Sequence, residues 1–285
     1  MQSNEQNGSL SGALPPLAVV GGGNMAHAIL SGAQDAGVLD LDRVVVADPS
    51  PDRRSLFPRA VASAGEAVAW LSEQDSDAGQ LVLAVKPQIF PRVAKEIGGV
   101  LKDGPARVVV SIMAGTTSES IRASLGGGVR VVRTMPNTPS QVRRGVTAIA
   151  LGAGAEPGDE DAIRAVMNAV GTTVAIEETM MDAFTGLAGS GPAYVFYLAE
   201  ALAKAGEGVG FSPEDARTIA ESVVIGSAYL LEGDNRSAGE LRRAVTSPNG
   251  TTQAGTESLD ASGVMDAVVR AVAAARDRGR ELAKG

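Results

Sequence analysis

The fold is decided by the stretch Leu17-Ala18-Val19-Val20-Gly21-Gly22-Gly23-Asn24-Met25-Ala26-His27-Ala28-Ile29-Leu30, in which a short apolar strand passes through a glycine turn into an amphipathic helix. Gly21 permits a tight turn, Gly23 lets the backbone approach a pyrophosphate, and Ala26 supplies the third small position. Phosphate oxygens would then meet free N–H groups at a helix N-terminus. The pattern indicates a dinucleotide-binding turn, and a glycine-rich turn without a ligand is the alternative.

Composition narrows the class of protein. The chain has 285 residues, of which 44% are hydrophobic and 20% charged, enough for one large domain or two smaller ones with their own cores. Its 33 acidic and 25 basic residues give a net charge of −8, which argues against binding to nucleic acid. With no cysteine and one histidine, we expect no metal site and no catalytic triad.

The sequence carries no targeting or membrane signal. Residues 1–13 are polar and lack the cationic and apolar pattern of a secretory signal, so we expect a flexible tail there. No run approaches the roughly 18 apolar residues of a membrane span. We therefore expect a cytoplasmic protein that does not enter a membrane.

A second apolar strand is expected over residues 43–47, which completes a βαβ unit and ends at Asp48. An acid at this place holds a ribose hydroxyl, whereas a nearby arginine accommodates a 2′-phosphate. Here Asp48 favours the unphosphorylated ribose, while Ser50, Arg53 and Arg54 offer a hydroxyl and two cations to NADPH. Both NADPH and NADH stay open, and the plain alternative is that the segment is only a turn.

The apolar runs that follow predict a mainly parallel sheet. Strands are expected at residues 81–85, 107–111, 129–133, 146–150 and 173–176, with a helix near 157–170. Near-continuous apolar strands suit a sheet covered by helices on both faces. Loops at strand carboxyl ends form the ligand crevice of such sheets, so Lys86 either faces the cofactor or is simply a solvated cation. We predict a dinucleotide-binding domain with a mainly parallel sheet over residues 14–177.

From residue 178 the pattern changes to helices. The segments 192–202 and 219–231 carry little charge around most of their circumference, so these helices should be buried on several sides and share a core with another subunit. We predict an all-α dimerisation domain over residues 178–285, and the turn described next would make it the substrate-binding domain as well.

One helix start in this second domain carries polar groups that could bind a ligand. In Thr246-Ser247-Pro248-Asn249-Gly250-Thr251-Thr252, hydroxyls and free N–H groups converge and would suit a small carboxylate. The alternative is that Ser247 is only a helix N-cap, with Pro248 at the first helical position.

Four segments match one family in order along the chain. They are Val20-Gly21-Gly22-Gly23-Asn24-Met25-Ala26, Arg133-Thr134-Met135-Pro136-Asn137-Thr138-Pro139, Leu187-Ala188-Gly189-Ser190-Gly191-Pro192-Ala193-Tyr194 and the Thr246 to Thr252 segment. From about Leu17 to Leu282 the chain closely resembles pyrroline-5-carboxylate reductase. The resemblance implies a Rossmann domain, a helical domain that interlocks into a dimer, and often a ring of dimers.

The resemblance also implies roles for residues. Together with Asp48 and Lys86 from the strand pattern, the expected cofactor-binding residues are Gly21, Gly23, Asn24, Met25, Ser50, Arg53, Ala84, Val85, Pro87 and Asn137. The expected substrate-binding residues are Met135, Ser247, Gly250, Thr251 and Thr252. Met135 and Asn137 would approach the nicotinamide end, and the catalytic group would be the Thr252 hydroxyl near the ring nitrogen of the substrate.

Two positions depart from the family pattern. Ala64 stands where many members have Asn, which puts one adenosine contact in doubt. Asn249 replaces a more usual Gly and is tolerable because Asn also adopts left-handed conformations.

The implied reaction is the reduction of 1-pyrroline-5-carboxylate to L-proline by hydride from NAD(P)H, the last step of proline biosynthesis. Alternatives are a reductase of another cyclic imine acid, such as pyrroline- or piperideine-2-carboxylate, and a dinucleotide-sensing protein without catalysis. A hydroxy-acid dehydrogenase is disfavoured because Val195 stands where that family would place lysine. An imine can bind already protonated and needs no strong acid, so His27 is expected to be structural.

Overall fold

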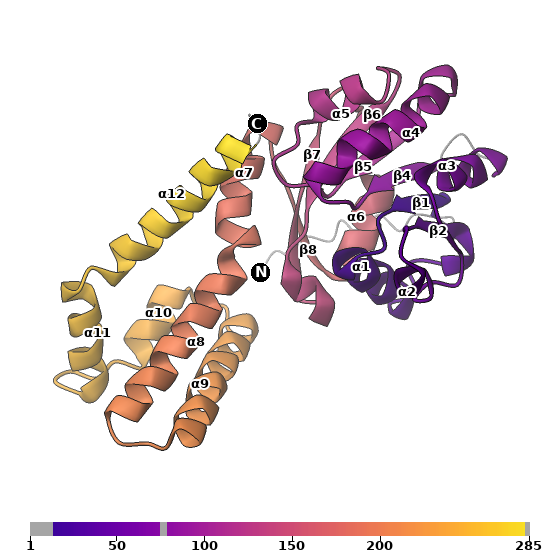
Figure 1. Cartoon of the computed structure of the whole chain (residues 1–285). Helices are drawn as coiled ribbons and strands as arrows, with labels where there is room; N and C mark the ends of the chain where they lie inside the picture. Colours follow the sequence, from indigo (N-terminus) through magenta and orange to yellow (C-terminus); the bar gives the residue numbers. More distant parts are fainter. Residues whose placement is uncertain (1–13, 75–78, 283–285) are drawn as a thin grey trace. The chain divides into compact units, whose positions relative to one another are not determined.

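The computed structural model describes residues 14–74 and 79–282 and divides the chain into two compact units (Figure 1). The first unit contains the chain up to Gly189 together with the residues from Arg276 onward, and the second is Ser190–Ala275. The flexible tail expected at residues 1–13 lies outside the described residues. The domain boundary expected at residue 178 stays a prediction, since compactness divides the chain after Gly189.

The first unit is built on an eight-stranded sheet in the order β3-β2-β1-β4-β5-β6-β7-β8. Its strands are β1 (Leu17–Val20), β2 (Val44–Ala47), β3 (Ala60–Val61), β4 (Gln80–Leu83), β5 (Val108–Ser111), β6 (Arg130–Met135), β7 (Gly145–Leu151) and β8 (Gly171–Ala175). Neighbouring strands run parallel, with the exception of β6 and β7, which are antiparallel. The predicted Rossmann-type, mainly parallel sheet is therefore confirmed.

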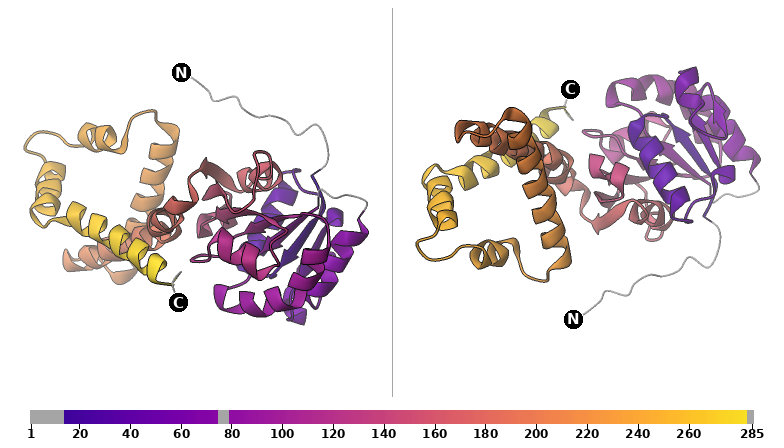
Figure 2. Two further views of the ribbon diagram at one scale, coloured as in Figure 1. Left: turned by 90° about the horizontal axis from the view of Figure 1, so that it is seen from above. Right: turned by 90° about the horizontal axis from the view of Figure 1, so that it is seen from below.

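Helices cover both faces of this sheet (Figures 1 and 2). One face packs against α1 (Asn24–Asp35) and α6 (Asp161–Asn168), and the other against α3 (Ala64–Glu73), α4 (Phe90–Asp103) and α5 (Ser118–Ser124). In β1, Leu17 and Val19 enter the first core while Ala18 and Val20 enter the second. Successive side chains of a strand point to opposite faces, so a strand buried on both sides has to be apolar throughout.

Some predicted bounds were wrong by a few residues. The expected strand at 81–85 ends at Leu83, and the two-residue strand β3 was not predicted. The helix expected near 157–170 begins at Asp161, because Gly158 adopts a φ of +100° in the turn before it. Such turns and short edge strands leave little periodic signal in a sequence.

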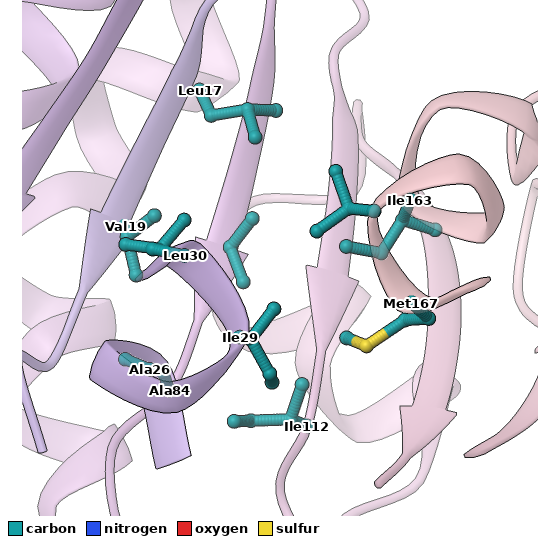
Figure 3. A pocket seen from close by; sticks show the side chains of 11 residues that line it. Leu17, Val19, Ala26, Ile29, Leu30, Ala84, Ile112, Ile163 and Met167 are labelled. Carbon is teal, nitrogen blue, oxygen red and sulfur yellow. The ribbon is translucent and has the colours of Figure 1, made fainter. Parts of the chain in front are cut away.

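An apolar pocket lies beneath α1 in the first core (Figure 3). It measures about 20 Å³ and is lined entirely by apolar residues, including Leu17, Ile29, Ile163 and Met167. A space of this size without polar groups is a gap in the packing and stays dry. The pocket is therefore not a candidate ligand site.

Several short helices and turns connect the strands and the longer helices of the first unit. They are α2 (Pro51–Arg54), the 3₁₀ turns η1 (Leu41–Arg43), η2 (Pro87–Ile89), η3 (Thr138–Val142) and η4 (Glu178–Met180), the short helix α7 (Met181–Phe184), and a π-helical turn at Thr185–Gly189. The π-helical turn directly precedes the second unit.

The second unit consists of α8 (Gly191–Gly208), α9 (Pro213–Gly233), α10 (Ala238–Ala244), α11 (Thr251–Ala261) and the first part of α12 (Val264–Leu282). Helices α8 and α9 pack along one another (Figure 1). The expected burial of α8 on several sides does not occur within one chain: α8, all of which is described, has no buried residue, and Phe196 and Tyr197 are 68% and 75% exposed. Such large apolar surfaces require a cover that the isolated chain does not supply.

Within the described ranges, no helix combines the length and apolar character needed to cross a membrane.

Candidate active site

The glycine turn lies where the carboxyl ends of β1, β2 and β4 meet. Gly21 donates its backbone N–H to the carbonyl oxygen of Ala47 at 2.8 Å and has a φ of +108°. A Cβ on Gly21 would lie 2.5 Å from the carbonyl oxygen of Ala84, a distance that real side chains do not reach. Glycine is therefore required here both by conformation and by space.

Gly23 is different, because no atom lies within 4 Å of the position its Cβ would occupy. It is also the N-cap of α1 and lacks a side-chain cap. Unpaired N–H groups in the first helical turn and open space beside the backbone are what a pyrophosphate requires. Gly21 thus makes the predicted tight turn and the space beside Gly23 is open, while the approach of a pyrophosphate to Gly23 stays a prediction.

Asp48 braces the glycine turn. Its Oδ2 accepts the backbone N–H of Gly22 at 2.9 Å, and its Oδ1 accepts the backbone N–H of Ser50, also at 2.9 Å. The carboxylate therefore ties the turn after β1 to the loop after β2. The sequence argument missed this bracing role, although an Asp that accepts the N–H two residues later is a common turn feature. Contact between Asp48 and a ribose stays a prediction.

The two arginines after β2 are held differently. Arg53 donates from Nη1 to the Oδ1 of Asn24 at 2.6 Å, whereas Arg54 donates from Nη1 to the carbonyl oxygens of Asp48 and Pro49 at 2.9 and 3.0 Å. Ser50 is the N-cap of α2. The structure thus brings Arg53 to the start of α1 beside the glycine turn and engages Arg54 with the loop backbone.

The segment after β4 faces the same edge of the sheet. Ala84 is half-buried against Gly21, Val85 and Pro87 are also half-buried, and Lys86 is exposed immediately before η2. Met25 packs partly against the first core from α1. These positions suit the lining of a bound dinucleotide, and their contacts with a cofactor stay predictions.

Asn137 joins two segments that are far apart in the sequence. Its Oδ1 accepts the backbone N–H of Val146 at 2.9 Å, and its Nδ2 donates to the carbonyl oxygen of Ala188 at 3.0 Å. The neighbouring Met135 also reaches this region, with its methyl carbon 3.3 Å from where a Cβ of Gly189 would lie. Two of the motifs quoted from the sequence therefore meet within the first unit.

Just after β8, the Glu178 carboxylate is held by hydrogen bonds from two distant parts of the chain. The backbone N–H and the hydroxyl of Ser118 both donate to the Glu178 carboxylate, the former at 2.7 Å. Arg133, which is buried, donates from Nη1 to the same carboxylate at 3.3 Å. The sequence patterns did not single out Ser118 or Glu178, because nothing local marks residues 60 positions apart as partners.

The turn at residues 246–252, which the sequence predicts to bind a carboxylate, lies in the second unit. Helix α11 begins at Thr251 with Gly250 as its N-cap, so the interpretation of Ser247 as an N-cap followed by Pro248 was wrong. Instead, Gly250 donates its N–H to the carbonyl oxygen of Ser247 at 3.0 Å, and a Cβ on Gly250 would overlap the Ser247 hydroxyl. The turn is closed by local backbone bonding, which a cap rule does not include.

The side chains of this turn are available to a ligand. Ser247, Thr251 and Thr252 are exposed, and the N–H groups in the first turn of α11 have no partners within the helix. Asn249 has a φ of +59°, which confirms that it takes the left-handed conformation expected of it.

The single histidine packs within the first unit. The Nε2 of His27 lies 3.5 Å from the Ser31 hydroxyl, and its ring meets the edge of Phe57 with centroids 5.7 Å apart. Among residues 14–74 and 79–282, no group of three or more His, Asp or Glu side chains is placed to hold a metal ion.

The first unit has a Rossmann-type sheet with an open glycine turn, and it is joined to a helical unit; this is the arrangement of a dinucleotide-dependent oxidoreductase. Residues 16–115 match the family model described as NADP oxidoreductase, coenzyme F420-dependent. Residues 178–282 match the model for pyrroline-5-carboxylate reductase dimerisation. The chain belongs to the pyrroline-5-carboxylate reductase family, to which it has relatives of 36% identity along nearly its whole length.

Relatives in bacteria and plants cover almost the entire chain. Pyrroline-5-carboxylate reductase from Pseudomonas aeruginosa is 36% identical over 271 residues, covering 95% of this chain and 97% of that protein. The enzyme of the same name from Pisum sativum is 35% identical, covering 93% and 95% of the two chains. Among solved structures, pyrroline-5-carboxylate reductase from Coxiella burnetii has a TM-score of 0.85 at 32% identity and covers 95% of this chain and all 100% of its own. Pyrroline carboxylate reductase from Plasmodium falciparum, solved with NADP bound, has a TM-score of 0.80 at 26% identity, covering 95% and 98%.

The family assignment explains the exposed helices. The dimerisation model spans the helical unit, whose large apolar side chains lie exposed in the isolated chain. The protein is a homo-oligomer, and these faces are the surfaces that another subunit would cover.

Proposed function

We propose that this chain reduces 1-pyrroline-5-carboxylate to L-proline with a hydride from NADPH, the last step of proline biosynthesis. The observation that carries the proposal is the open, hydroxyl-rich turn at the start of α11 in a chain that also has an open glycine turn. The first suits a small carboxylate and the second a pyrophosphate.

The first unit would hold the dinucleotide. The N–H groups at Gly23, Asn24 and Met25 suit the pyrophosphate, and Arg53 with Ser50 suits a 2′-phosphate on the adenosine ribose. Asp48, Ala84, Val85, Lys86 and Pro87 would complete the lining. NADPH supplies the hydride when bound, and the protein supplies position and exclusion of side reactions.

The second unit would hold the substrate. Ser247 and the segment from Gly250 to Thr252 would bind the carboxylate, Met135 would contact the substrate from the first unit, and the Thr252 hydroxyl would lie near the ring nitrogen. Because an imine can bind already protonated, hydride addition to the carbon of the C=N bond gives a neutral amine directly. Such a step requires no strong acid on the protein.

A steady-state assay tests the proposal. Purified protein is given 1-pyrroline-5-carboxylate with NADPH and, separately, with NADH, and proline formation is measured. Parallel assays with pyrroline-2-carboxylate and piperideine-2-carboxylate test the other cyclic imine acids. A protein that binds NADPH but neither turns over an imine nor binds a proline analogue would be a dinucleotide sensor.

We further propose that dimers assemble into a ring and that the enzyme is cytoplasmic and does not bind nucleic acid. The exposed apolar helices and the family's dimerisation region support assembly, and the net charge of −8 disfavours a nucleic-acid partner. We also retain the boundary at residue 178 as the functional start of the helical domain, where the dimerisation match begins. Light scattering gives the subunit number.

A further inference from the structure

A carbonyl group is left without its normal helical partner where the chain leaves the first unit. In a regular helix, the carbonyl oxygen of Ala188 would accept the N–H of residue 192. That residue is Pro192, which has no N–H and whose ring crowds the carbonyl four residues earlier. The helix responds with the π-helical turn Thr185–Gly189 directly before α8.

Asn137 supplies the missing donor. Its Nδ2 donates to the Ala188 carbonyl oxygen at 3.0 Å, and its side chain cannot easily turn away because Oδ1 accepts the Val146 N–H at 2.9 Å. The residue is only 7% exposed, so water does not readily replace either bond. The two partners also fix which end of the amide is the donor: a carbonyl oxygen needs an N–H, and a backbone N–H needs an oxygen.

The position of this turn gives the contact its significance. The first of the two segments that make up the first unit ends at Gly189, so the chain enters the second unit through the turn that Asn137 holds. The Met135 methyl carbon, 3.3 Å from the Cβ position of Gly189, supports the same turn from β6. Upstream, Glu178 is anchored by Ser118 and Arg133, so the segment between Glu178 and Gly189 is held at both ends.

We propose that Asn137 is a positioning residue for imine reduction: it holds the π-helical turn through Ala188, and this turn lies against Met135, which is proposed above to contact the substrate. The proposal rests on the proposed function. It replaces direct contact with the nicotinamide by an indirect role, in which Asn137 acts through the backbone at residues 185–189.

The test uses Asn137→Asp in the full-length protein. Aspartate preserves the volume and the acceptor for Val146 but removes the donor to Ala188. We expect kcat/KM for 1-pyrroline-5-carboxylate to fall about tenfold or more, since a buried acceptor loses its partner. We expect the dissociation constant of NADPH, measured by fluorescence titration, to stay within about twofold of wild type, because no dinucleotide contact is lost. Amide hydrogen exchange at residues 185–191 should become faster.

Asn168→Asp is the matched control. The Oδ1 of Asn168 accepts the Thr173 hydroxyl at 2.9 Å in the same unit, and a carboxylate oxygen can make that bond equally well. This variant should keep wild-type kinetics and wild-type exchange at residues 185–191. If Asn137→Asp does not fold, Asn137→Ala is measured in the same way, and the same contrast between imine turnover and NADPH affinity is expected.

Three results would overturn the proposal. Unchanged imine kinetics in Asn137→Asp would show that the turn does not need this donor. Loss of NADPH affinity with unchanged exchange would make Asn137 a direct cofactor ligand. Faster exchange throughout the first unit would reduce it to a general stabilising role. If wild type fails to reduce the imine, the proposed function fails, and the exchange at residues 185–191 still decides whether Asn137 holds the turn.

Discussion

The Nη1 of Arg53 lies 2.6 Å from the Oδ1 of Asn24, so a guanidinium from the loop after β2 is fastened to the first residue of α1. Arg54, its neighbour in sequence, instead donates to the carbonyl oxygens of Asp48 and Pro49. Two adjacent arginines that look equivalent in the sequence therefore have different environments. This difference makes cofactor preference testable one residue at a time.

We expect Arg53→Ala to raise the KM for NADPH about tenfold while changing the KM for NADH little, because only NADPH carries the 2′-phosphate that would take a charge-assisted hydrogen bond. Arg54→Ala is the paired variant and should affect the two cofactors equally, through the loop it supports. Steady-state measurement of the KM for NADPH and for NADH in each variant tests this expectation. Equal effects of Arg53→Ala on the two KM values would show that Arg53 does not read the phosphate.

The geometry of the glycine turn predicts contrasting effects for alanine substitutions at its two glycines. Gly21→Ala places a Cβ 2.5 Å from the Ala84 carbonyl oxygen at a φ of +108°, and we expect it to lower the free energy of unfolding by about 2–4 kcal/mol. Gly23→Ala enters open space at a φ of −70° and should cost less than about 1 kcal/mol in stability, yet weaken NADPH binding. Denaturant unfolding and NADPH titration separate the two effects, and similar loss of stability in both variants would contradict the assignment.

Thr252→Val removes the exposed hydroxyl near the start of α11 and leaves a side chain of similar shape. We expect kcat/KM for the imine to fall roughly tenfold or more, as for the loss of a hydrogen bond of about 1.5–3 kcal/mol to a charged partner. NADPH affinity should not change. Thr256→Val is a control on the same helix, because its hydroxyl already donates to the carbonyl oxygens of Thr252 and Gln253. Wild-type kinetics in Thr252→Val would remove this residue from the mechanism.

His27 should be replaceable. Its Nε2 is within hydrogen-bond distance of the Ser31 hydroxyl and its ring packs on the edge of Phe57, and both contacts lie within the first unit. We expect His27→Gln to retain most of the kcat. We also expect the pH dependence of kcat/KM in the direction of imine reduction to be the same in wild type and variant, since it should follow ionisation of the substrate. Loss of turnover in a folded variant that still binds NADPH would mean that His27 handles the proton.

The anchor at Glu178 should matter for stability. Glu178→Gln removes the charge beside Arg133, whose side chain is only 8% exposed, and we expect a loss of about 2–4 kcal/mol because a buried cation is left without its carboxylate. Glu221→Gln is the matched control, since its pair with Arg217 has side chains 53% and 75% exposed and should contribute little to stability. Thermal unfolding of the two variants measures the difference, and equal shifts would show that the Glu178 anchor contributes no more than a surface pair.

Some features were decided by local sequence. The apolar strands and the glycine turn were predictable because strand burial on two faces and the conformation at Gly21 are written in consecutive residues. The left-handed Asn249 was predictable for the same reason. By contrast, the cap rule failed at Ser247, because the turn closes by its own backbone hydrogen bond before α11 begins.

Other features were decided only by the tertiary structure, because they depend on residues that the fold brings together. The contact of Asp48 with a ribose stays a prediction from the sequence, whereas only the fold shows that its carboxylate accepts the N–H of Gly22, 26 residues earlier. The contact of Asn137 with the cofactor is likewise untested, whereas only the fold shows that its amide donates to the carbonyl oxygen of Ala188, 51 residues later. The sequence alone determined which backbone conformations and buried faces were possible. Which polar side chain meets which unpaired N–H or carbonyl was settled by the sheet order and loop placement, since a buried hydrogen bond forms with whatever group the fold brings within reach.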